Sequence, residues 1–281
     1  MRPGASVGAM NEPAARANAS STACAQGTAG AAPEAVIAPA VTVADFRRNL
    51  AVVRARINAA AGRAGRDAGE IRLLPVSKTV PEERLRAAFA AGMTQMGENK
   101  VQEGARKAGN LADLGIHWAL IGHLQTNKVK QAVAFAAEFQ ALDSLRLAEA
   151  LDRRLQEAGR ALDVYVQVNS SGEPSKFGLE PEEVAGFLAR LPHYSSLRVR
   201  GLMTLAARTT DEARVRACFH LMRELRDAGL QAGTVGEGEL SMGMSGDFEL
   251  AIESGSTCVR VGQAIFGARP DPTHPSGNAT P

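Results

Sequence analysis

The chain has 281 residues, a hydrophobic content of 45% and a formal net charge of +2, which allows one large domain with a sizeable core. Acidic and basic residues are interspersed without a basic arm, and aromatic residues are few, so nucleic-acid binding is not expected. No apolar segment approaches the roughly 18 residues that a membrane-spanning helix needs.

The first 40 residues differ in composition from the rest. Residues 1–40 are rich in Ala, Gly, Ser and Pro and nearly lack large apolar side chains. Such a segment cannot bury enough apolar surface to offset the entropy lost on ordering, so we expect a disordered extension. It lacks the compact apolar region of a secretory signal. Residues 270–281 are similarly predicted to form a flexible tail.

The cysteines bear on location. Cys24, Cys218 and Cys258 are odd in number, scattered and without a CxxC spacing. This usage suits reduced thiols in a cytoplasm better than a disulfide framework. The five histidines are dispersed as well, so a structural zinc site is not expected.

Residues 41–269 alternate between amphipathic and apolar segments. Apolar residues at three- and four-residue spacing predict a first helix over 43–65. Strands are then predicted over 71–78, 95–99, 117–123, 138–144, 162–169, 197–206, 239–245 and 258–267, with helices between them. Eight strands alternating with helices predict an α/β protein with a single (β/α)₈ TIM barrel. A doubly wound open sheet is the alternative.

Polar residues end almost every predicted strand, where a barrel places its chemistry. They are Lys78, Asn99, His123, Asp143, Ser144, Asn169, Thr204, Ser245 and Arg260. Lys78 is either a rim lysine that extends to solvent or a nucleophilic amine that forms a Schiff base. The second role requires a lowered pKa, which the apolar LLPV segment and a cation such as Arg260 can provide.

The segment after the seventh predicted strand suggests an anion site. Gly243, Ser245 and Gly246 form a small-residue turn before a helix, where backbone N–H groups and a hydroxyl can bind an anion. The turn can also be an ordinary one capped by Asp247.

Arg260 lies inside an apolar strand and therefore needs a partner. That partner is a carboxylate, phosphate or ring nitrogen inside the barrel, or a surface acid on the helix side. Gly262 would let a ligand approach the backbone, in the region where barrels often bind phosphate. An aldehyde-binding lysine and a phosphate site fit two ligands, a phosphorylated sugar or pyridoxal 5′-phosphate.

Six stretches resemble the pyridoxal phosphate homeostasis protein family, in the family's order and over nearly all of residues 45–269. They are LLPVSKTVP, GENKVQEG, HWALIGHLQTNKVK, VQVNSSGEPSKFGL, VRGLMTLA and LSMGMSGDFELAIESGSTCVRVGQAIFGAR. The resemblance implies a fold like the barrel domain of alanine racemase, with pyridoxal phosphate held as a Schiff base.

The resemblance also implies roles for individual residues. Lys78 would be the Schiff-base lysine and Arg260 would face the pyridine nitrogen. Ser245, with the backbone of Gly262 and Gln263, would hold the phosphate. The residues implied to lie near the cofactor are Asn99, His123 and Met242. The sequence departs from the family at Gln263, where many members have Thr or Ser, and at Lys100, where Tyr or Arg is frequent.

The expected role is binding and supply of the cofactor, not catalysis. An arginine opposite the pyridine nitrogen weakens the electron sink that pyridoxal phosphate catalysis uses. No further domain supplies the second base of a racemase, and neither Tyr165 nor Tyr194 is well placed for it. We expect a monomeric cytoplasmic protein that sequesters pyridoxal phosphate and supplies it to apo-enzymes. The alternatives are a pyridoxal-phosphate-dependent racemase or lyase, and a Schiff-base aldolase acting on a phosphosugar.

Overall fold

The computed structural model of the protein describes residues 40–267. The extension predicted over 1–40, apart from Ala40, and the tail predicted over 270–281 lie outside the described residues. Within residues 40–267, no helix is both long enough and apolar enough to cross a membrane.

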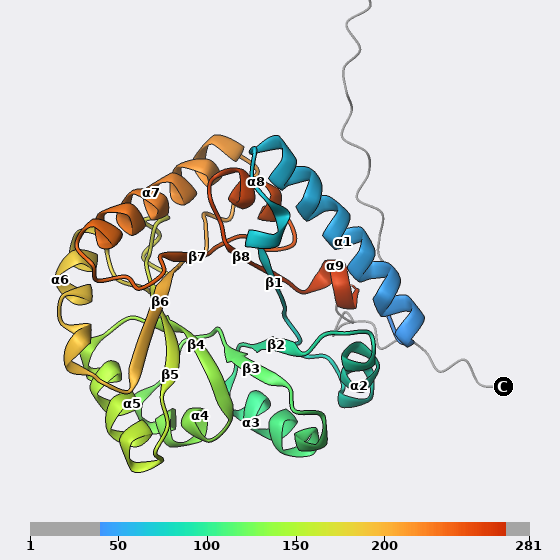
Figure 1. Ribbon diagram of the computed structural model, residues 1–281, viewed down its shortest axis with the longest axis horizontal. Helices are drawn as coiled ribbons and strands as arrows, with labels where there is room; N and C mark the ends of the chain where they lie inside the picture. Colours follow the sequence, from blue (N-terminus) through green and yellow to red (C-terminus); the bar gives the residue numbers. More distant parts are fainter. Residues whose placement is uncertain (1–39, 268–281) are drawn as a thin grey trace, which may run out of the picture. The chain divides into compact units, whose positions relative to one another are not determined.

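The described chain forms one sheet of eight parallel strands with helices around it (Figure 1). The strands are β1 (Arg72–Pro75), β2 (Gln95–Glu98), β3 (His117–Leu120), β4 (Ala136–Leu142), β5 (Leu162–Gln167), β6 (Leu197–Met203), β7 (Glu239–Ser241) and β8 (Cys258–Val261). Their order in the sheet is β1-β8-β7-β6-β5-β4-β3-β2. Because every strand lies beside its sequence neighbour and β8 lies beside β1, there is no topological switch point, and the doubly wound alternative is wrong.

The barrel closes between β1 and β2 through a short contact. Val76 and Gly97 form a parallel bridge, and the Ser77 N–H donates to the Gly97 carbonyl at 2.9 Å. The predicted (β/α)₈ barrel is therefore confirmed, with a seam at which the pairing is short.

The helices cover the outside of the sheet (Figure 1). They are α1 (Val43–Arg63), α2 (Glu82–Ala90), α3 (Val101–Asn110), α4 (Val129–Phe135), α5 (Leu145–Glu157), α6 (Val184–Leu188), α7 (Glu212–Gln231), α8 (Phe248–Glu253) and α9 (Gln263–Phe266). Thr42 and Asp45 form a capping box at the start of α1. The predicted apolar stripe of α1 is confirmed, since Phe46, Val53 and Ile57 are buried.

Side chains of β1 alternate between the barrel interior and the helix layer. Arg72 binds Glu138 of β4 at 2.9 Å and the Tyr165 hydroxyl of β5 at 2.9 Å. Because β4 and β5 do not neighbour β1, these contacts cross the interior. We call Arg72, Gln95, Glu138, Tyr165 and Glu239 the basal layer, since hydrogen bonds and ion pairs join them and three of them are the first residues of their strands.

Candidate active site at the carboxyl ends of the strands

The structure places the predicted site residues beyond the carboxyl ends of their strands, the end opposite the basal layer, except Arg260, which lies inside β8 one residue before its end. They are Lys78, Asn99, His123, Met242, Ser245, Arg260, Gly262 and Gln263. These residues come from five strands that are remote in sequence, and the barrel topology brings them to one mouth.

Lys78 lies on the turn that follows β1. The residue before it, Ser77, is directed toward Glu98 and Lys107, since its hydroxyl donates to Glu98 and its carbonyl accepts from Lys107. The Lys78 side chain is half-buried. Thr79 follows with a φ of 65°, the single positive φ outside glycine among residues 40–267. Such a conformation persists only where the surroundings hold it in place.

A buried ionic cluster holds that turn. Lys107 of α3 is fully buried, and its Nζ donates to the Ser77 carbonyl at 2.8 Å, to Glu98 Oε1 at 2.8 Å and to Glu103 Oε1 at 2.7 Å. The Ser77 hydroxyl donates to Glu98 Oε1 at 2.6 Å, and the Thr79 N–H donates to Glu103 Oε1 at 2.7 Å. We call Glu98, Glu103 and Lys107 the Lys107 cluster.

The carboxyl groups of the Lys107 cluster differ in acidity. Burial raises the pKa of Glu98, and the attraction of Lys107 opposes the rise. Burial alone would raise the pKa of Glu103, but hydrogen bonds from Lys107 and the Thr79 N–H outweigh burial and lower that pKa.

Sequence reasoning missed the Lys107 cluster. Lys107 reads as an ordinary solvent-exposed lysine on a predicted helix. Two signals were available: Glu98 at the end of an apolar strand, and Glu103 four residues before Lys107 on one helix face.

Arg260 points into the barrel. Its guanidinium donates to Ser241 Oγ at 2.7 Å and to the Thr204 carbonyl at 2.7 Å. Thr204 follows β6, which does not neighbour β8, so the second contact crosses the interior, and the alternative pairing on the helix side is wrong. Arg260 is only 3% exposed, and burial lowers its pKa. Both hydrogen-bond acceptors are uncharged, and no carboxylate among residues 40–267 is hydrogen-bonded to this cation.

The turn between β7 and α8 is fixed by its own backbone. Gly243 has a φ of 97°, and a Cβ there would lie 2.6 Å from Ala251 Cβ. The Asp247 carboxylate accepts a hydrogen bond from the Met244 N–H, which precedes the helix. Asp247 is the N-cap residue of α8, but its side chain makes no capping hydrogen bond to the helix, so the predicted cap by Asp247 is wrong. Ser245, between Met244 and Asp247, is half-buried. Burial raises the pKa of Asp247, and the hydrogen bond from Met244 opposes the rise.

Gly262 and Gln263 follow β8 directly. A Cβ on Gly262 would lie 3.2 Å from the Val76 carbonyl oxygen, so the residue permits a close approach between the ends of β8 and β1. Gln263 is exposed at the start of α9.

The other predicted residues occupy different depths. Asn99 and His123 are exposed at the mouth, whereas Met242 is fully buried in the larger hydrophobic cluster. His123 Nδ1 lies 3.3 Å from Asp143 Oδ2, and its ring stacks on Phe177 with centroids 4.1 Å apart. Burial raises the pKa of Asp143, and His123 opposes the rise. The Phe177 contact, from the loop after β5, was not predicted.

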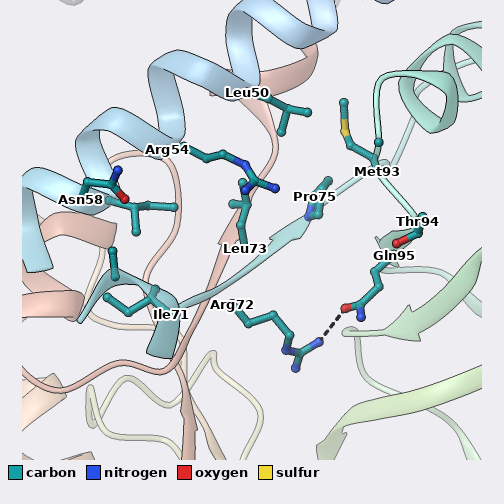
Figure 2. A pocket seen from close by; sticks show the side chains of 13 residues that line it. Leu50, Arg54, Asn58, Ile71, Arg72, Leu73, Pro75, Met93, Thr94 and Gln95 are labelled. Atoms are coloured by element: carbon teal, nitrogen blue, oxygen red, sulfur yellow. Dashed lines mark hydrogen bonds between the residues drawn. The ribbon is translucent and has the colours of Figure 1, made fainter. Parts of the chain in front are cut away.

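Two cavities lie away from this mouth. One of about 400 Å³ lies outside the barrel, between α1 and the starts of β1 and β2, with Leu50, Arg54 and Met93 among its lining residues (Figure 2). The other, of about 670 Å³, is lined by the basal layer. Neither cavity is lined by a predicted site residue, so neither marks the candidate active site.

The chemistry of the mouth suits an anionic aldehyde. Lys78 supplies an amine, Arg260 a buried cation with uncharged partners, and Ser245 a hydroxyl beside a fixed turn. Amine, cation and hydroxyl together match an aldehyde group, a polar ring and a phosphate. The residues present therefore fit pyridoxal 5′-phosphate.

Comparison with known proteins gives consistent results. Residues 44–270 match the family model of the alanine racemase N-terminal domain. A pyridoxal phosphate homeostasis protein of Pseudomonas aeruginosa is 42% identical over 221 residues, covering 79% of this chain and 94% of that protein. One from Escherichia coli is 42% identical over 233 residues, covering 80% and 97%.

Solved structures extend the comparison. The structure of PipY from Synechococcus elongatus with pyridoxal phosphate bound is 34% identical with a TM-score of 0.69, covering 79% of this chain and 100% of that chain. Alanine racemase from Corynebacterium glutamicum is 16% identical with a TM-score of 0.62, covering 86% and 66%, which shows the fold alone.

Proposed function

The chain belongs to the pyridoxal phosphate homeostasis protein family, and on that premise we propose that it binds pyridoxal 5′-phosphate covalently through Lys78 and supplies it to apo-enzymes. The observation that carries the proposal is the placement of Lys78 at the same barrel mouth as Arg260, whose hydrogen-bond partners are uncharged.

Lys78 acts as a reversible tether in this proposal. Its neutral amine attacks the aldehyde carbon and forms a C=N bond, while the aldehyde oxygen leaves as water with two amine hydrogens. Only the neutral form of an amine is a nucleophile that can form this bond. Another amine that enters the mouth can displace Lys78 by the same chemistry in reverse, which allows release.

The surrounding residues support orientation of the ligand. Ser245 and the backbone at Gly262 and Gln263 are proposed to bind the phosphate, and Arg260 to lie against the pyridine nitrogen. Asn99 and His123 are proposed to line the open side. Met242 is proposed to support the site from the hydrophobic cluster in which it is buried.

A carrier role fits better than catalysis. Tyr165 belongs to the basal layer and donates to Glu239 at 2.5 Å, and burial together with Glu138 raises its pKa above the usual range. Tyr194 packs against the larger hydrophobic cluster. The sequence has only these two tyrosines, so neither supports the role of a second base at the mouth. The free thiols Cys218 and Cys258 support the proposed cytoplasmic location.

The test is loading of the purified protein with pyridoxal phosphate. We expect visible absorption that persists through dialysis, and borohydride should fix the cofactor on the peptide that carries Lys78. Lys78→Ala should abolish the fixation, whereas Lys130→Ala, on the exposed face of α4, should not. A protein that stays colourless, or that is fixed equally after Lys78→Ala, contradicts the proposal. Turnover of an amino acid would favour the racemase or lyase alternative.

A further inference from the structure

We propose that Lys107 is a positioning residue for Lys78: the buried Lys107 cluster fixes both peptide units that flank Lys78 and thereby sets where its amine stands. This inference rests on the proposed function. It concerns a lysine that does not reach the ligand and acts through the backbone.

The first step is the peptide before Lys78. All three polar groups of Ser77 are engaged: the N–H donates to Gly97 at 2.9 Å, the hydroxyl to Glu98 at 2.6 Å, and the carbonyl accepts from Lys107 at 2.8 Å. The Ser77 carbonyl and the Lys78 N–H share one rigid peptide plane. By binding that carbonyl, Lys107 fixes the orientation of the peptide plane that precedes Lys78.

The second step is the peptide after Lys78. The Thr79 N–H donates to Glu103 Oε1 at 2.7 Å, and the same oxygen accepts from Lys107. Thr79 holds a φ of 65°, a conformation that a β-branched residue rarely adopts. Glu103 therefore holds the strained side of the turn, and Lys107 holds Glu103.

The third step is the energetic balance of the cluster. Lys107 and Glu98 are both fully buried, and burying such ions costs several kcal/mol each before pairing offsets it. Glu98 Oε2 has no hydrogen-bond partner among residues 40–267, so the cluster is not optimised for stability alone. Apolar packing would hold α3 against β2 equally well, but it would leave the Ser77 carbonyl without its donor.

The consequence concerns the covalent bond specifically. A turn that relaxes after loss of Lys107 would lower the effective concentration of the Lys78 amine at the ligand, which matters for forming the C=N bond. Noncovalent binding at the phosphate turn, on β7 and β8, should be unaffected. Changes in such supporting residues typically alter affinity by about 10- to 100-fold.

The experiment is a double-mutant cycle between Lys107→Met and Lys78→Ala. Retention of pyridoxal phosphate is measured by dialysis and by the amount that borohydride fixes. We expect Lys107→Met to weaken retention by at least about 10-fold, and to have no further effect once Lys78→Ala is present. Pyridoxine 5′-phosphate, which lacks the aldehyde, should bind Lys107→Met as it binds the original protein.

Two controls separate positioning from general destabilisation. Arg72→Met removes a charge from the other end of β1 and should lower stability without changing retention. If Lys107→Met alone does not fold, Glu98→Gln with Lys107→Met removes one charge of each sign and keeps an acceptor for the Ser77 hydroxyl.

The outcomes are distinct. An original protein that never binds pyridoxal phosphate overturns the proposed function itself. Unchanged retention in Lys107→Met, an equal loss of pyridoxine 5′-phosphate binding, or an effect that persists beside Lys78→Ala overturns the positioning role alone. Failure of both Lys107 variants to fold assigns the cluster to folding and overturns it as well.

Discussion

At the scale of single residues, two lysines close together in the fold have opposite environments. Lys107 has three N–H donors, and all three are engaged in hydrogen bonds to oxygen. A side-chain nitrogen buried and engaged in this way is out of reach of a ligand at the mouth. Lys78 is half-buried at the open mouth, where an amine can meet a ligand. Depth thus separates a lysine that organises backbone from a lysine at the mouth.

Glu98 gives a prediction about pH. Burial raises its folded-state pKa above the ordinary value of 4.5, so the folded protein binds more protons than the unfolded chain in this range. The stability contributed by the protonated form is present below pH 4.5 and is lost as pH rises through the folded-state pKa. The glutamine of Glu98→Gln stays neutral at every pH. The unfolding free energy of this variant should therefore increase relative to that of the original protein as pH rises from 4.5.

Urea unfolding over a pH series measures this difference. The control is Asp113→Asn, because a hydrogen bond from Arg86 lowers the pKa of Asp113. Asp113 contributes stability that is lost as pH falls, so this variant should show the opposite trend. The same trend in both variants would contradict the assignment for Glu98.

At the scale of elements, the loops that follow β7 and β8 depend on backbone shapes that few residues allow. Gly243 combines a φ of 97° with contacts that leave no room for a Cβ. That conformation turns the chain out of β7 and starts α8 five residues later. The position of Ser245 follows from this turn, so the proposed phosphate site depends on a residue that does not touch the ligand.

Gly243→Ala should therefore destabilise the fold and the site together. A Cβ would lie 2.6 Å from Ala251 Cβ and 2.8 Å from Phe248 Cα, and the backbone would be strained as well. We expect a loss on the order of 1–3 kcal/mol of unfolding free energy with weaker binding of pyridoxine 5′-phosphate. Gly246→Ala is the matched control, because a Cβ there meets nothing within 4 Å. Equal effects of the two changes would refute this explanation.

Element boundaries also show where prediction from sequence stops. The number and order of strands follow from alternating apolar and amphipathic segments, and all eight predicted strands exist. The predicted strand over 239–245 ends at Ser241, and the one over 258–267 ends at Val261. A glycine follows closely in both cases, Gly243 with a φ of 97° and Gly262 directly after β8.

Contacts between distant elements could not be predicted in this way. The hydrogen bond from Lys107 to Ser77 spans 30 residues, and that from Arg72 to Tyr165 spans 93. Periodicity reports which face of an element is buried, but not which residue of another element it meets. The polar residues at the strand ends therefore predicted where the site lies. The residues that hold Lys78 in place could not be predicted, because their contacts join distant segments.

At the scale of the whole molecule, the barrel separates two polar ends. Leu74, Ala119 and Cys258 form an apolar cluster inside the barrel, between the basal layer and the mouth. The basal layer contains charged groups that pair with one another, whereas Arg260, toward the mouth, has uncharged hydrogen-bond partners. This difference agrees with a structural role at one end and ligand binding at the other.

Tyr165→Phe tests the separation. Loss of the hydroxyl removes hydrogen bonds to Arg72 and Glu239, and bonds to charged groups contribute about 1.5–3 kcal/mol each. We expect lower unfolding free energy in urea and unchanged retention of pyridoxal phosphate. Tyr194→Phe should change neither, since the Tyr194 hydroxyl makes no hydrogen bond within residues 40–267. Loss of the cofactor in Tyr165→Phe would show that the two ends are coupled.

The segment before α1 and the end of α9 come together at one side chain. Arg84 of α2 donates to the Ala40 carbonyl at 2.7 Å and also to the Phe266 carbonyl. A barrel whose first and last segments meet in this way can be treated as a ring, in which the starting point is arbitrary. A circular permutant of residues 40–267 that joins Ala40 to Gly267 through a linker and opens the exposed turn at Gly233 would keep every strand pair. The barrel's stability should then depend on its closed order of strands and not on which strand is made first.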